Sequence, residues 1–258
     1  MSKIKFDINI VASLAIFILF YLSLILGFNL EEDSAGGAKY DYHIHLKTLL
    51  FFSDSISAGL LSYDKLGDLN NTHSPIFIIF LKFIFKFFGD FSRFFYLNLC
   101  LASIWVFFLI LRKKYEKLSI ANSFLISNFF LLSPYFRSSA IWPGDENIAI
   151  LFFLLSVYFY IKWSKSKFHK QNNLNLFCNI LFLASASYFR PIYSLFSVFF
   201  FYEMVLKNFQ FKTFLYYISA SLLLSLPAIY YVFFLKINFF GSYISSKNIL
   251  NSAALSFT

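Results

Sequence analysis

Three consecutive carboxylates and two nearby histidines follow the first apolar segment of this chain. The acids are Glu31, Glu32 and Asp33, and the histidines are His43 and His45. A positioned carboxylate can take a proton from a reacting hydroxyl as a general base, and neighbouring carboxylates can hold a hard divalent cation through their oxygens. The cluster therefore predicts proton transfer or cation binding at the end of an apolar segment.

Other residues able to do chemistry stand near the ends of later apolar segments. They are Asp41, His73, Arg93, Arg137, Asp145, Glu146 and Arg190. Asp41 and His45 are four positions apart, so a helix would place them on one face. Arginine suits phosphate because its planar guanidinium matches the phosphate oxygens. We expect these loops to converge on one side of the molecule.

The composition places these residues in a membrane protein. Apolar residues make up 59% of the chain and charged residues 14%, and the mean hydropathy is +0.67, whereas a soluble domain is far more polar. The net charge of +9 comes from basic residues between apolar runs, which is typical of cytoplasmic loops and does not indicate nucleic-acid binding. Cys100 and Cys178 lie inside apolar runs, so we expect neither a disulfide nor a metal site from them.

Seven apolar segments are expected to span the membrane. They cover about residues 8–28, 94–111, 118–134, 147–162, 175–189, 191–206 and 213–235. Several are shorter than the roughly 20 residues that a helix needs to cross a bilayer. The first segment is too long for the core of a signal peptide and no small-residue cleavage site follows it, so we expect it to remain as an anchor.

The apolar stretch 75–88 is expected to lie on the membrane surface. Lys82 and Lys86 interrupt it at helical spacing and would form its polar stripe. If this stretch crossed the membrane, the basic cluster 112–117 would lie on the opposite side from the N-terminal lysines. With the stretch on the surface, the basic clusters share one side, as cytoplasmic loops do.

This layout gives one integral membrane domain over residues 1–258, in the cell (inner) membrane, with a cytoplasmic N-terminus. The loop 29–92 lies on the outer side, and its amphipathic stretches 39–52 and 54–66 predict further surface helices. Between positions 29 and 74 this loop holds seven acidic and three basic residues. The expected fold is an all-α, multi-pass helical bundle with its site on the outer face.

Each polar residue also has a purely structural interpretation. Acids at a helix end can mark a solvated boundary, and arginines can extend to the lipid headgroups. Ser74-Pro75 is a good helix start, which leaves His73 unexplained. Glu203 stands four residues before Lys207 near an inner segment end and is expected to be structural. The functional interpretation therefore depends on several such loops meeting on one side.

The order of these features resembles the GT-C glycosyltransferases, in particular the branch that contains the protein O-mannosyltransferases and the lipid A aminoarabinose transferases. Glu31-Glu32-Asp33 stands where that family has an acidic pair after its first span, and His73-Ser74-Pro75 partly matches the family's His-Pro-Pro element. Shorter matches are Arg93, Arg112-Lys113-Lys114, Ser133-Pro134, and Asp145 or Glu146. The resemblance covers nearly the whole chain as architecture and degenerate motifs.

The resemblance implies a polyprenyl-phosphate-linked sugar as donor and a lipid, glycan or protein as acceptor, among membrane lipids and without nucleic acid. Asp33 or Glu32 would be the general base, and the same two carboxylates would be the ligands if a divalent cation (Mg²⁺ or Mn²⁺) takes part. The donor would be bound by Arg93, Arg137, Arg190 and His73, supported by Asp41, His45, Asp145 and Glu146. Most family members continue beyond this seven-span module, so a minimal version and a truncated reading frame both stay open.

Two other classes of protein compete with a glycosyltransferase. A transporter or flippase of a lipid-linked solute usually has charges at mid-membrane and repeated halves, and neither is visible here. A non-catalytic assembly protein of the cell envelope would tolerate neutralisation of the acidic cluster. Replacing these acids therefore separates an enzyme from an assembly protein.

Overall fold

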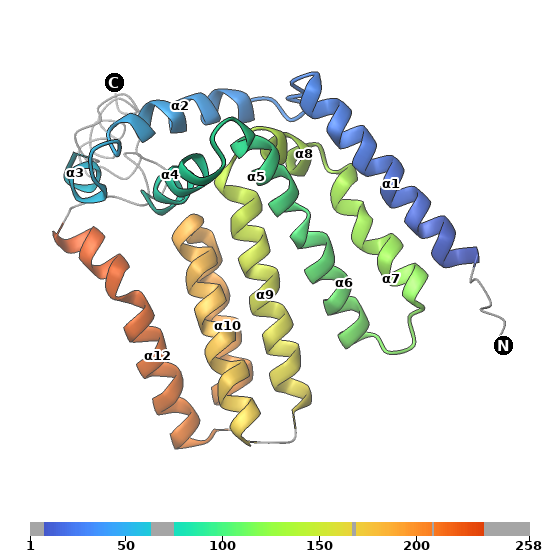
Figure 1. Cartoon of the computed structure of the whole chain (residues 1–258). Helices are drawn as coiled ribbons and strands as arrows, with labels where there is room; N and C mark the ends of the chain where they lie inside the picture. The colour runs from blue at the N-terminus through green and yellow to red at the C-terminus, as the bar shows by residue number, and fades with distance from the viewer. Residues whose placement is uncertain (1–7, 63–74, 167–168, 208, 235–258) are drawn as a thin grey trace, which may run out of the picture.

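The computed structural model describes residues 8–62, 75–166, 169–207 and 209–234, and within them every regular element is helical (Figure 1). The α-helices are α1 (Ile8–Asn29), α2 (Ala38–Leu50), α3 (Ile56–Ser62), α4 (Pro75–Phe88), α5 (Ser92–Cys100), α6 (Ala102–Lys114), α7 (Ile120–Ser127), α8 (Pro134–Ile141), α9 (Asp145–Lys165), α10 (His169–Phe189), α11 (Phe196–Phe201) and α12 (Phe211–Ile229). Shorter helical turns are η2 (Gly89–Phe91), η3 (Asn128–Leu132), η4 (Pro191–Leu195), η5 (Tyr202–Leu206) and η6 (Tyr230–Phe234). The expected all-α class is confirmed for the described part of the chain.

The long helices run side by side and the helices of the first loop lie across one end of them (Figure 1). We call this end, where α2, α3 and α4 lie, the capped end. Four helical stretches are long and apolar enough to cross a membrane: Ile8–Asn29, Pro75–Lys114, Asp145–Lys165 and Phe211–Ile229. Three shorter apolar stretches are Ile120–Leu132, Asn173–Phe189 and Pro191–Leu206. These findings support a membrane-embedded protein, and seven crossings stay a prediction.

The stretch 75–88 forms a helix of its own at the capped end. α4 and the following helices form one continuous apolar run by length and composition, but the chain turns between α4 and α5 at Gly89, whose φ is +50°. Glycine adopts this left-handed conformation without the clash that a side chain would bring. Lys82 of α4 donates hydrogen bonds to the carbonyl oxygens of Phe52 and Ser53 just after α2, so its charge lies at the C-terminal end of that helix.

Helix termini follow local rules that orient the chain. α9 begins with Asp145 and Glu146 and ends with Lys162 and Lys165 in its last turn, which complements the helix dipole at both ends. The last turn of α6 also carries three basic residues, and it lies at the same end of the bundle as the end of α9 (Figure 1). The basic clusters at the ends of α6 and α9 therefore share the end opposite the capped end.

The best-buried core lies directly beneath the capped end. Tyr96, Phe77 and Leu97 are completely buried there, and Trp142 is nearly so. By contrast, α12 has most of its apolar side chains exposed, as expected for a helix that faces lipid. The molecule is thus rigidly packed where its polar residues gather.

The topology can be tested by labelling a single cysteine at the basic end. Tyr115→Cys, placed in a Cys178→Ala background because Cys178 is partly exposed, should react with a membrane-impermeant maleimide only after the membrane is permeabilised, since basic loops face the cytoplasm. Tyr40→Cys on α2 is the matched control and should react in intact cells. Labelling of position 115 from outside would show that the proposed layout is inverted or has a different number of crossings.

Candidate functional site

The acidic cluster begins where α1 ends. The Glu32 amide donates to the Gly27 carbonyl at 2.8 Å, and Glu31 adopts a left-handed φ of 54°, which together form the helix-ending turn that usually has glycine at this position. The turn folds the chain back over the last residues of α1. Glu31 itself pairs with Lys39 of α2 at 2.6 Å on the surface.

Glu32 is held by a two-pronged ion pair with Arg137. The Nε and Nη2 atoms of Arg137 donate to the two carboxylate oxygens at 2.9 and 2.5 Å, and the Ser34 hydroxyl adds a third hydrogen bond at 2.9 Å. These hydrogen bonds, above all those from Arg137, lower the pKa of Glu32 from its ordinary value. Glu32 is therefore a firmly ionised partner of Arg137, and the ion pair weakens only as the pH falls below the ordinary carboxyl pKa of 4.5.

Arg137 reaches Glu32 because of the way α8 starts. Ser133 caps the helix by accepting a hydrogen bond from the amide of Phe136 at 3.3 Å, and Pro134 occupies the first turn, where its fixed φ suits a helix start. Arg137 directly follows Phe136 in this first turn of α8. The expected Ser-Pro motif thus positions one arm of the ion pair.

Asp33 differs from Glu32 in having a free oxygen. Its Oδ1 atom is buried and has no hydrogen-bond partner in the described residues. The backbone carbonyl of Asp33 accepts from Gly36 at 3.0 Å, and Gly36 and Gly37 have φ values of 68° and 93°, so the chain makes a tight glycine turn here. A buried carboxylate oxygen without a donor is better suited to accept a proton than one that already bonds an arginine.

A polar cavity of about 200 Å³ lies next to this turn. Its lining residues are Ala35, Gly36, Ala38, Asp41, His45, Tyr135, Ser139, Gly144, Asp145 and Glu146. Asp41 and His45 both belong to α2, so they lie on one face of a helix as expected. His45 is buried, and its ring meets the ring of Phe77 edge-on at a centroid distance of 4.9 Å.

Arg190 binds the two acids that open α9. Its Nη2 atom lies 2.9 Å from a carboxylate oxygen of Asp145 and also pairs with Glu146. Asp145 is only 1% exposed, so this pair is a buried one on the Asp145 side. The Nε–H of Arg190 is buried and has no partner among the described residues, so the guanidinium keeps one free donor.

Arg93 stacks in an aromatic environment away from the cavity lining. Its guanidinium lies 3.8 Å from the ring centroid of Trp142 and donates to the carbonyl of Ile141 at 3.3 and 3.4 Å. Trp142 in turn donates to the backbone carbonyl of Glu32 at 3.0 Å. Arg93 therefore reaches the acidic turn through Trp142, and its contacts are those of a positioning residue.

The predicted site residues form two neighbouring groups at the capped end. One contains Glu32, Asp33 and Arg137. The other contains Asp41, His45, Asp145 and Glu146, which line the polar cavity, and Arg190, which pairs with Asp145 and Glu146. His43 is exposed, and its ring lies 6.1 Å from that of Trp142. His73 lies outside the described residues. Among the residues that the structure describes, no group of three or more His, Cys, Asp or Glu side chains is arranged to hold a metal ion.

Gly27 is a site residue that the sequence reasoning missed. A Cβ atom on Gly27 would overlap the Glu32 carboxylate and come within 3.1 Å of Arg137. The signal was a glycine in the last turn of an apolar helix, four residues before the acids. The ion pair therefore packs on bare backbone of α1.

Replacing Gly27 by Ala should destabilise the protein, although alanine is the better helix former by about 1 kcal/mol. The methyl group displaces Glu32 from Arg137, and loss of this half-buried pair should lower the free energy of unfolding by about 1–3 kcal/mol. Thermal unfolding in detergent measures the change. Leu26→Ala, at an exposed position of the same turn, is the control, and a Gly27→Ala variant at least as stable as that control would contradict the packing described.

Comparison with known proteins found no match to this chain among family models, curated proteins or solved structures. The similarity to the GT-C glycosyltransferases stays a hypothesis based on motif order. The functional conclusion therefore depends on the geometry of the capped end.

Proposed function

We propose that this protein is a membrane glycosyltransferase that moves a sugar from a polyprenyl-phosphate carrier to an acceptor hydroxyl on the outer side of the membrane. One observation carries the proposal: the acidic polar cavity adjoins an apolar cavity of about 500 Å³. The two cavities share the lining residues Tyr135, Ser139 and Glu146. A substrate with a polar head and an apolar tail fits such a junction.

The apolar cavity is built by the sides of helices and not by loops. Its lining comes mainly from aromatic and aliphatic residues of α6, α7, η3 and α9, among them Phe107, Ile126, Phe130 and Ile150. These helices belong to the apolar stretches that favour the membrane. A lipid tail in this cavity would therefore remain in an apolar environment while its phosphate lay at the capped end.

The transfer step assigns one role to each polar group. Asp33 takes the proton of the acceptor hydroxyl as that oxygen bonds to the anomeric carbon of the sugar, and the bond from this carbon to the carrier phosphate breaks. The phosphate leaves with the electron pair. Attack from the side opposite the phosphate inverts the anomeric carbon.

Arg190 is the best-placed group to stabilise the departing phosphate. It lies between the acids that line the polar cavity, and its unpaired Nε–H can donate to a phosphate oxygen as charge develops. Arg137 and Arg93 use their donors on Glu32 and on the backbone of Ile141, respectively. We therefore assign these two to positioning the acidic turn.

The decisive experiment is a donor-consumption assay in membranes. Membranes that contain the protein are supplied with a lipid extract of radiolabelled polyprenyl-phosphate sugars, and loss of label from the lipid fraction is followed. Membranes containing the Asp33→Asn variant at equal abundance are the control. Equal loss of label in both preparations, or none in either, would count against the proposed function.

One observation favours the competing class, a non-catalytic assembly protein of the envelope. The guanidinium groups of Arg93, Arg137 and Arg190 all contact other parts of this protein, as purely structural arginines would. Such a protein would keep its biological role after Asp33→Asn. The behaviour of that single variant therefore separates the two classes.

A further inference from the structure

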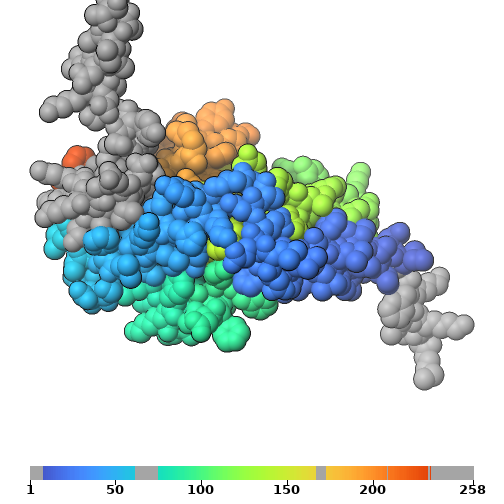
Figure 2. Space-filling view, turned by 90° about the horizontal axis from the view of Figure 1, so that it is seen from above, coloured from blue at the N-terminus to red at the C-terminus, as the bar shows by residue number. Residues whose placement is uncertain are grey.

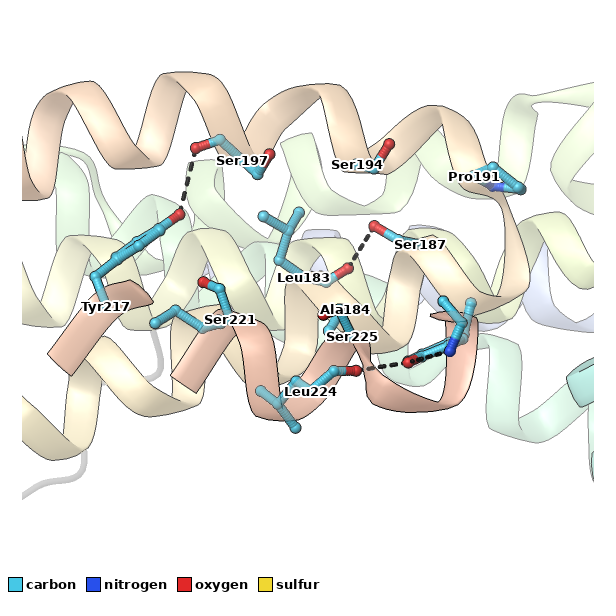
Figure 3. A pocket seen from close by; sticks show the side chains of 13 residues that line it. Leu183, Ala184, Ser187, Pro191, Ser194, Ser197, Tyr217, Ser221, Leu224 and Ser225 are labelled. Carbon is cyan, nitrogen blue, oxygen red and sulfur yellow. Dashed lines mark hydrogen bonds between the residues drawn. The ribbon is translucent and has the colours of Figure 1, made fainter. Parts of the chain in front are cut away.

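A third cavity, of about 370 Å³, lies between α10, α12 and the segment η4–α11 (Figure 3). It is separate from the polar cavity, since the two share no lining residue. Seven of its residues are small: Ala184, Ser187, Ser194, Ser197, Ser221, Ser225 and Ala228. Small residues on facing membrane helices normally let the helices pack closely. Some other interaction must therefore keep these helices apart.

Two tyrosines hold α12 at the ends of this gap. The Tyr217 hydroxyl of α12 donates to the Ser197 carbonyl at 3.3 Å. The Tyr188 hydroxyl of α10 donates to the Leu224 carbonyl at 2.5 Å and accepts from the Ala228 amide at 3.2 Å. Figure 3 shows these two links on either side of the cavity. The spacing of the helices is therefore fixed by hydrogen bonds.

Pro227 explains why α12 can accept this second link. Proline inside a helix disturbs the backbone hydrogen bonds around it. The Tyr188 hydroxyl bonds to both the Leu224 carbonyl and the Ala228 amide. In a regular helix these two groups would bond directly to each other, and Pro227 lies in the turn between them. A side chain from a neighbouring helix that satisfies freed backbone groups is one way in which a membrane helix tolerates proline.

The lining of the cavity is apolar in effect. The Ser187 and Ser225 hydroxyls donate to carbonyls of their own helices, Leu183 and Leu222, both at 2.8 Å. Ile180, Leu183 and Leu224 complete the wall with hydrocarbon. Among the residues that the structure describes, no charged side chain lines the cavity. A molecule bound here would be recognised by hydrocarbon contact.

We propose that the α10–α12 cavity binds an acyl chain of a bilayer phospholipid. α12 is a candidate membrane span with only 11% of its apolar window buried, so the medium around the cavity is lipid. An empty apolar space of this size forfeits contacts along its whole lining, and a hydrocarbon chain restores them without displacing any hydrogen bond. This inference does not depend on the enzymatic activity proposed above.

Photo-crosslinking in vesicles tests the occupant. The full chain is reconstituted into phosphatidylethanolamine–phosphatidylglycerol vesicles that contain a phospholipid with a diazirine in its acyl chain, and labelled peptides are identified after illumination. Adducts are expected on the cavity residues Ala184 and Ser187 as well as on the exposed Leu223 of α12. A free fatty acid carrying the same diazirine forms the second arm and should label Ala184 and Ser187 less than the phospholipid does.

Ser221→Phe fills the cavity and should remove the adducts on Ala184 and Ser187 while those on Leu223 remain. Leu222→Phe, at an exposed neighbouring position, is the matched control and should leave all adducts in place. Ser225→Leu gives a milder filling if the phenylalanine variant does not insert. Absence of cavity adducts in the unmodified protein, their persistence in the filled variants, or stronger labelling by the free fatty acid would overturn the proposal.

Discussion

Replacing Asp33 by Asn should lower the rate of sugar transfer by about 10²–10⁴-fold, the usual contribution of a general base. The amide keeps the shape of the side chain but cannot accept the proton of the acceptor hydroxyl. Since the buried Oδ1 of Asp33 has no hydrogen-bond partner within the described residues, the change breaks no hydrogen bond at that oxygen. Turnover at saturating donor, measured in reconstituted vesicles, gives the effect directly.

Two comparison variants make this result specific to Asp33. Asp90→Asn changes an exposed acid at the same end of the molecule and should leave turnover unchanged. Glu32→Gln weakens the ion pair with Arg137, so it should lower the thermal stability as well as the rate. In the view from above, α1 and α2, in blue, form a large part of the visible surface (Figure 2).

Near-normal turnover in Asp33→Asn, in Glu32→Gln and in the double variant would defeat the assignment of a general base in this cluster. It would also favour the assembly-protein class. If a metal ion takes part instead, the same variants should raise the concentration of Mg²⁺ or Mn²⁺ needed for activity. That outcome would assign these carboxylates as ligands of the cation and not as the general base.

Replacing Arg190 by Ala should lower turnover by about 10²–10³-fold, the effect of removing one donor to a developing anion. The guanidinium is the cation nearest the acids Asp145 and Glu146, and its free Nε–H would be lost. Arg190→Lys should recover only part of the activity because an ammonium lacks the planar fork. The donor KM and the turnover number are both measured.

Stability must be measured alongside the Arg190 variants. Asp145 is 1% exposed, and removing its cationic partner leaves a buried charge uncompensated. Arg190→Lys keeps the charge and so reports on the phosphate contact with the fold preserved. Lys86→Ala, an exposed cation at the same end, is the control for nonspecific loss of charge. Full activity in a stable Arg190→Lys protein would contradict the proposed contact between the planar guanidinium group and the carrier phosphate.

Local patterns in the chain predicted much of the architecture. Apolar runs predicted the long helices, and the amphipathic pattern of the stretches 39–52 and 54–66 predicted α2 and α3 in the first loop. The helix α4 was expected at 75–88 and is found there. These features depend on neighbouring residues only, which is why they can be derived without coordinates.

The pairing of the charged residues could not be derived in this way. Glu32 and Arg137 are 105 positions apart in the chain, and Arg190 is 44 positions from Glu146. All three arginines were expected to bind phosphate, yet one holds Glu32, one stacks on Trp142 and one bridges the acids of α9. Sequence alone treated Glu32 and Asp33 as near equivalents.

The sequence by itself determined that this is an apolar, helical chain whose acids and arginines stand at segment ends, because hydropathy and helix-terminal preferences are local properties. Only the tertiary structure decided which acid is paired and which has a free oxygen, because that depends on how α1, α8 and α9 pack at the capped end. It also decided that Gly27 must lack a side chain and that Tyr188 and Tyr217 hold open the cavity between α10 and α12. Contacts between helices distant in the chain set these features, and no local pattern encodes them.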